Sequence, residues 1–122
     1  MSETLYGDGD ATLEAGEETL HLRGAPGFHN ATALAVAGVE WLERAEISHV
    51  SFDACDVGRV SSATLSILLE WLRTSHRRGI EIDRITLSDR IRELVELAEL
   101  SGVFRARETS FAASSWARAA RR

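Results

Sequence analysis

The sequence has no lysine and contains a single cysteine and a single proline among its 122 residues. One cysteine cannot form an internal disulfide, so Cys55 excludes a disulfide-stabilised fold and fits a reducing compartment. One proline, nine glycines and no low-complexity tract exclude long linkers and extensive disorder. We therefore expect a single domain over residues 1–122, with residues 1–10 as a flexible start.

Long apolar stretches are also absent. No run approaches the roughly 18 apolar residues that a membrane-spanning helix requires. The start, Met-Ser-Glu-Thr-Leu-Tyr-Gly-Asp, has neither a basic residue nor an apolar core, so a secretory signal is not expected. A hydrophobic content of 44% is nevertheless sufficient for a modest core. These features predict a cytoplasmic protein without a transmembrane segment.

Basic residues are fewer than acidic ones, and the formal net charge is −5. This charge gives no general attraction to nucleic acid, so nucleic-acid binding is not expected. The end of the chain is basic through Arg105, Arg107, Arg118, Arg121 and Arg122. A solvated helix end is the favoured explanation, and contact with anionic lipid or an acidic partner is the alternative.

Hydrophobic periodicity predicts strands and helices in alternation. Strands are expected at residues 11–15, 19–23, 49–55 and 80–87, with a short edge strand at 103–106. Helices are expected at residues 30–45, 61–78, 88–100 and 110–120, the second of them ending at a glycine cap. This order predicts an α/β fold. Its sheet would be mixed but mostly parallel, with four or five strands, an antiparallel edge hairpin and about four flanking helices.

Two adjacent serines, Ser61 and Ser62, stand at the start of the leucine-rich second helix. Either hydroxyl can cap the helix, which contributes about 1 kcal/mol relative to alanine. The exposed N–H groups and the positive dipole end at the same place would also let a hydroxyl bind a partner or accept a phosphate. The residues alone leave both interpretations open.

The same helix has two apolar flanks. At about 100° per residue, one flank is a stripe predicted to face the core, formed by Leu65, Leu68, Leu69 and Leu72. Ile67 and Trp71 lie on a different flank and predict either a partner-binding patch or a surface that another helix covers. Leu97, on the following helix, is predicted to extend that patch.

The run Phe-Asp-Ala-Cys-Asp-Val-Gly-Arg-Val-Ser-Ser-Ala-Thr-Leu, residues 52–65, resembles the STAS domain (sulfate transporter and anti-sigma factor antagonist). Ser61 stands where that family commonly has Asp, and Ser62 stands at its Ser/Thr position. Ala63 and Thr64 replace the small residues that follow. Residues 92–102 resemble the family's third helix and its glycine stop, and the resemblance covers residues 11–120. It implies a STAS-type fold.

Within the family, Leu-Leu-Glu-Trp-Leu-Arg after the serines and Arg-Arg-Gly before the next strand look most like the MlaB branch. This resemblance implies a bacterial, non-enzymatic accessory subunit that binds and regulates the ATPase of a phospholipid-trafficking ABC transporter. Its location would be cytoplasmic, at the inner membrane only through its partner. The residues implied to bind the partner or accept a phosphate are Ser62, Ser61 and Thr64.

Two alternatives remain open. The first is an anti-sigma-factor antagonist that binds an anti-sigma kinase and is switched by phosphorylation of Ser62. The second is a metabolite-binding STAS module. An enzyme is not expected, because Cys55 has no histidine near it in sequence and no nucleophile–base pair is discernible. The four histidines lack metal-ligand spacing, so neither a metal nor a cofactor is expected.

Overall fold

The computed structural model describes residues 2–104 and 108–111. They form one six-stranded sheet whose strands lie in chain order, β1-β2-β3-β4-β5-β6. The strands are β1 (Ser2–Gly7), β2 (Ala11–Gly16), β3 (Thr19–Gly24), β4 (His49–Val57), β5 (Glu81–Leu87) and β6 (Glu108–Phe111). The described helices are α1 (Ala31–Arg44), α2 (Ser62–Arg77) and α3 (Asp89–Leu97).

Strand pairing confirms the predicted α/β fold with a mixed sheet. β1, β2 and β3 pair antiparallel, whereas β3–β4, β4–β5 and β5–β6 pair parallel. Parallel neighbours need a crossover connection, and α1, α2 and α3 supply the three crossovers. The sheet has six strands, one more than the upper end of the predicted range of four or five.

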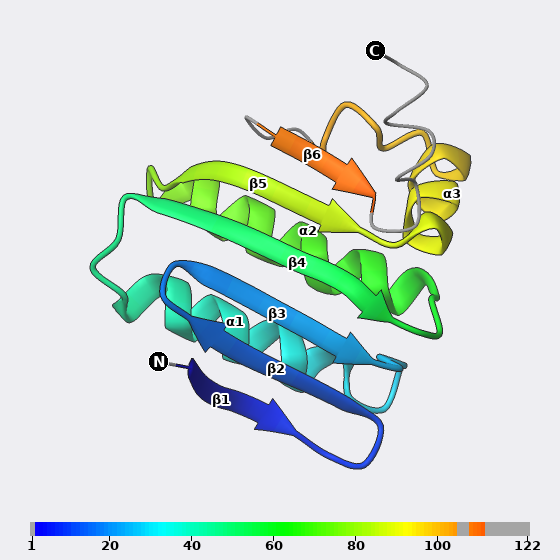
Figure 1. The fold of residues 1–122 in the computed structure, drawn as a ribbon, viewed down its shortest axis with the longest axis horizontal. Helices are drawn as coiled ribbons and strands as arrows, with labels where there is room; N and C mark the ends of the chain where they lie inside the picture. Colours follow the sequence, from blue (N-terminus) through cyan, green and yellow to red (C-terminus); the bar gives the residue numbers. More distant parts are fainter. Residues whose placement is uncertain (1, 105–107, 112–122) are drawn as a thin grey trace.

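The helices lie on one face of the sheet. Figure 1 shows α1 and α2 side by side behind the strands, with α3 beyond the carboxyl end of β5. Val50, Phe52 and Ala54 of β4 are buried on that face, while the alternating residues between them are only half-buried on the other. No described helix covers this second face, and none in the described part of the chain is long and apolar enough to cross a membrane.

The expectation of a flexible start is wrong, because Ser2–Gly7 forms the edge strand β1. Asp8 holds the turn that follows: its carboxylate accepts hydrogen bonds from the backbone N–H of Ala11 (2.8 Å) and Asp10 (2.7 Å). The Tyr6 hydroxyl (2.7 Å) and the Asn30 amide (3.2 Å) donate to the same carboxylate. These bonds, the Ala11 N–H first among them, hold the pKa of Asp8 well below its usual range.

The structure also corrects the elements predicted at residues 103–106 and 110–120, as far as these residues are described. Val103 and Phe104 belong to a turn and a bend rather than to an edge strand, and the last strand among the described residues is Glu108–Phe111. Ser110, predicted as a helix cap, lies inside β6. The rest of the predicted last helix, residues 112–120, lies outside the described residues.

The predicted patch of Ile67 and Trp71 is not on the surface, since both side chains are 0% exposed. α1 covers them: the Trp71 indole N–H donates to the Ala35 carbonyl at 3.3 Å. The indole also packs against Phe52 of β4, with ring centroids 5.9 Å apart. The core stripe itself is confirmed, with Leu65, Leu68 and Leu72 buried and Leu69 partly so. Both flanks of α2 therefore contribute to the core.

Gly38 of α1 makes room for this indole, because a Cβ atom there would clash with Nε1 of Trp71. Gly38→Ala should therefore lower the free energy of unfolding by about 1–3 kcal/mol, although alanine favours a helix by about 1 kcal/mol over glycine. Chemical denaturation measures the change. Val36→Ala, at an exposed position of the same helix, is the control and should change the free energy of unfolding little. A stabilised Gly38→Ala variant would show that the indole is seated elsewhere.

Candidate functional site

The three described helices all begin at the same end of the sheet, where the parallel strands have their carboxyl ends. Each helix begins where a parallel strand ends: α1 follows β3, α2 follows β4 and α3 follows β5. Helix starts carry N–H groups without intrahelical partners and a partial positive charge. The serine pair predicted to bind a partner, Ser61 and Ser62, lies at this end of the sheet, where β4 leads into α2.

The loop that leads into α2 is tied to the neighbouring strand. The Gly58 N–H donates to the Gly24 carbonyl at 2.8 Å. Gly24 has a φ of +91°, and a side chain there would also clash with the carbonyl oxygen of Asp10. Glycine is therefore required at the end of β3, and the hydrogen bond from Gly58 to its carbonyl holds the loop before α2.

Ser61, not Ser62, is the N-cap of α2. Its hydroxyl accepts a hydrogen bond from the Ala63 N–H at 3.2 Å. The Ser61 N–H donates to the Thr64 hydroxyl at 3.3 Å, which completes a reciprocal capping box. Thr64 is fully buried, so its hydroxyl and that of Ser61 are engaged within the helix start.

Ser62 is the first residue of α2 and is exposed. Its carbonyl accepts a hydrogen bond from the Ser66 hydroxyl at 3.2 Å. Its own hydroxyl has no hydrogen-bond partner among residues 2–104 and 108–111. The two serines thus differ: one stabilises the helix, and the other presents a hydroxyl to solvent.

A ridge of mixed apolar and charged side chains lies beside this helix start. Leu97, at the end of α3, is 81% exposed. It borders a shallow hollow of about 430 Å³ together with Val60, Arg90, Glu93 and Leu94. We call these five residues the α3 ridge. Val60 directly precedes the cap residue Ser61, so the ridge adjoins the start of α2.

The predicted patch is therefore divided. Leu97 is exposed as predicted, but it lies with Val60 and Leu94 and not with the buried pair Ile67 and Trp71. Sequence patterns predicted no role for Val60. The signal for Val60 was its place immediately before the cap, where an apolar residue commonly packs against the helix it precedes.

Comparison with known proteins gives the family. The family described as Mlab, STAS domain matches residues 11–106. The chain belongs to this STAS family. No curated protein sequence matches it. Among solved structures, one described as the anti-sigma factor antagonist SpoIIAA in its unphosphorylated form has a TM-score of 0.62 at 11% sequence identity. That match covers 91% of this chain and 96% of the other, and at this identity it shows a shared fold.

The single thiol of this STAS domain is not activated. Burial, followed by a hydrogen bond with Asp53, raises the pKa of Cys55 to about 12. Asp53 also contacts His21, whose Nδ1 lies 3.2 Å from its Oδ2. Because a thiolate is the reactive form of cysteine, a raised pKa leaves Cys55 protonated and poorly nucleophilic at neutral pH.

Within residues 2–104 and 108–111, one group of side chains has ligand atoms close enough for a cation, which the spacing of the histidines did not predict. Nδ1 of His49 lies 3.0 Å from Asp83 and 3.4 Å from Glu81, across the start of β4 and β5. The hydrogen bond to Asp83, with the charges of nearby carboxylates, raises the pKa of His49. A protonated His49 imidazole carries the positive charge that these carboxylates attract, so the group is accounted for without a bound cation.

The separate roles of the two serines can be measured by substitution. Ser61→Ala removes the cap and should lower the free energy of unfolding by about 1 kcal/mol. Ser62→Ala removes a hydroxyl without an internal partner and should change it by less than about 0.5 kcal/mol. Urea denaturation of the two variants and the wild type tests this difference. A larger loss for Ser62→Ala would make Ser62 the cap.

Proposed function

We propose that this STAS domain is a non-enzymatic accessory subunit that binds and regulates the cytoplasmic ATPase of an MlaB-type phospholipid-trafficking ABC transporter. One observation carries the proposal: the exposed Ser62 hydroxyl at the start of α2 follows by two residues Val60, which lines the α3 ridge together with the exposed Leu97. Hydroxyl, apolar and charged groups over one shallow surface suit a protein partner better than a small molecule, which needs a more enclosed site.

The family match supports the choice of partner, because the model that matches residues 11–106 is the Mlab type. Binding at this surface could alter the ATPase only through a difference in affinity between its conformations or between its folded and unfolded forms. The subunit would then lie in the cytoplasm and reach the inner membrane only through its partner.

A second function is supported by a different observation. The solved structure with the same fold is described as an anti-sigma factor antagonist in its unphosphorylated form. The Ser62 hydroxyl could accept a phosphate, which the N–H groups at the start of α2 would stabilise. The partner would then be an anti-sigma kinase, and phosphorylation of Ser62 would switch binding.

Two substitutions test the transporter proposal. Leu97→Glu places a charge in the apolar part of the surface and should weaken binding to the transporter ATPase of the same organism by at least about tenfold. Ser62→Asp should leave stability unchanged or raise it by roughly 0.3–1 kcal/mol, since a negative group favours a helix start. The same aspartate should weaken binding, because its charge must be desolvated in the interface. Isothermal titration and thermal melts give the two quantities.

Ser48→Glu is the control, because it adds the same charge to an exposed position at the opposite end of the strands, just before β4. It should bind the ATPase like wild type. Wild-type binding by both Leu97→Glu and Ser62→Asp would remove the proposed surface. Phosphorylation of wild-type Ser62 by the organism's anti-sigma kinase, detected by mass spectrometry, would favour the antagonist function instead.

A further inference from the structure

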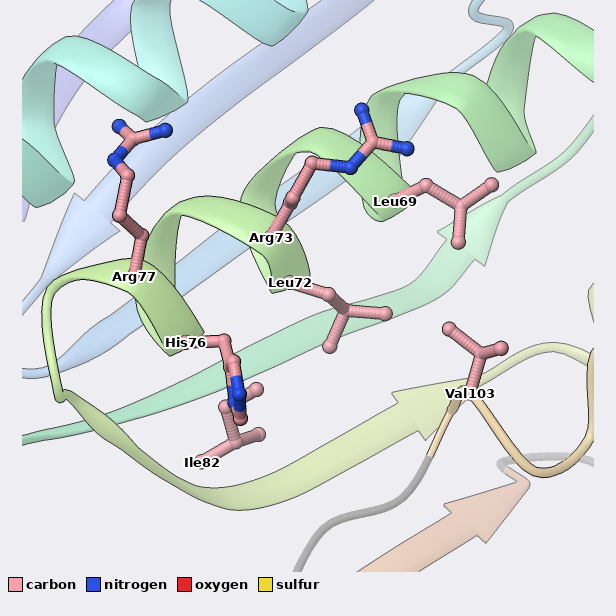
Figure 2. Close-up of a pocket in the computed structure, with 7 residues that line it drawn as sticks. All are labelled: Leu69, Leu72, Arg73, His76, Arg77, Ile82 and Val103. Carbon is pink, nitrogen blue, oxygen red and sulfur yellow. The ribbon is translucent and has the colours of Figure 1, made fainter.

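An apolar groove follows the carboxyl-terminal half of α2. Its volume is about 550 Å³, and its lining residues are Leu69, Leu72, Arg73, His76, Arg77, Ile82 and Val103. Figure 2 shows Leu69 and Leu72 projecting from α2 toward the side that Val103 occupies, with His76 next to Ile82 of β5. The apolar members come from a helix, a strand and a turn, so the floor of the groove is assembled by the fold.

The groove is open because α3 lies elsewhere. α3 follows β5 at its carboxyl end, whereas Ile82 is at the start of β5. Val103, at one wall of the groove, is 49% exposed. No helix of the described residues covers this flank of α2, although its opposite flank is covered by α1. Leu69, Leu72 and His76 follow the i, i+3, i+7 spacing along which a second helix can pack.

The rim of the groove is basic in a chain whose net charge is −5. Residues 70–78 contain Arg73, Arg77 and Arg78 against one acid, Glu70. Arg73 pairs with Glu70 at 2.5 Å and Arg77 with Glu43 at 3.1 Å. Both pairs are solvent-exposed, and exposed ion pairs contribute little to stability. A partner's carboxylates could therefore replace Glu43 and Glu70 at little cost.

We propose that this groove receives an acidic amphipathic helix of the partner protein. This would be a second contact, in addition to the one at the start of α2. The inference rests on the proposed function for the identity of that partner. The apolar face of the helix would pack on Leu69, Leu72 and Val103, in the helix-in-groove mode. Its flanking carboxylates would meet Arg73 and Arg77, which supplies the charge complementarity.

A matched pair of substitutions tests the groove. Val103→Glu places a negative charge at the groove wall, and Val36→Glu makes the same change on α1 at a position of almost equal exposure, 49% against 48%. We expect Val103→Glu to weaken binding to the transporter ATPase by at least about tenfold, and Val36→Glu by less than about twofold. Arg73→Gln combined with Arg77→Gln should weaken binding and reduce its dependence on salt.

Thermal melts and the Leu97→Glu variant separate the possible failures. A fall in Tm of more than about 5 °C for Val103→Glu but not Val36→Glu would show that the chain itself fills the groove, which overturns the inference. Wild-type binding by Val103→Glu, with binding lost in Leu97→Glu, would overturn the groove and leave the proposed function standing. Wild-type binding by both would overturn both. Loss of binding in Val103→Glu alone, at unchanged Tm, would support the groove and reject the α2 start.

Discussion

The packing of Trp71 of α2 against α1 and β4 is the interaction on which the rest of the structure depends. The fully buried indole meets Ala35 and Gly38 of α1 and the ring of Phe52. It therefore fixes the rotation of α2 about its own axis. Ser62 precedes Trp71 by nine residues, which is about 180° around a helix at about 100° per residue. Once the indole points inward, Ser62 has to point outward.

This rotation separates stability from recognition at one helix end. Ser61 and Thr64 close the capping box inside the fold, so the start of α2 keeps its conformation without help from Ser62. The exposed hydroxyl can then be used for binding at little cost to folding. The fold places no described helix between the start of α2 and the α3 ridge, and the exposed Leu97 stays accessible beside it. A surface of this kind suits a domain whose function is to be bound.

Local signals predicted the elements that local interactions determine. Ser88 accepts the cap hydrogen bond of α3 from Ile91, and Gly79 has the positive φ of +70° expected of a glycine after a helix. The edge strand β1 was missed because four of its six residues are exposed, so it lacks the apolar alternation from which the other strands were predicted. The burial of Trp71 was left open for a different reason. Periodicity shows that a flank is apolar, but not which helix covers it, and the fit of Gly38 to the indole exists only in three dimensions.

Hydrogen–deuterium exchange of the domain, alone and in complex with the transporter ATPase, tests the account most directly. Amides at the start of a helix lack intrahelical acceptors and depend on caps or solvent, so they report contact at that end. We expect slower exchange on binding at residues 60–66 and 90–97, with no change across β2 and β3. Protection confined to the strands, with the start of α2 exchanging as in the free domain, would contradict it.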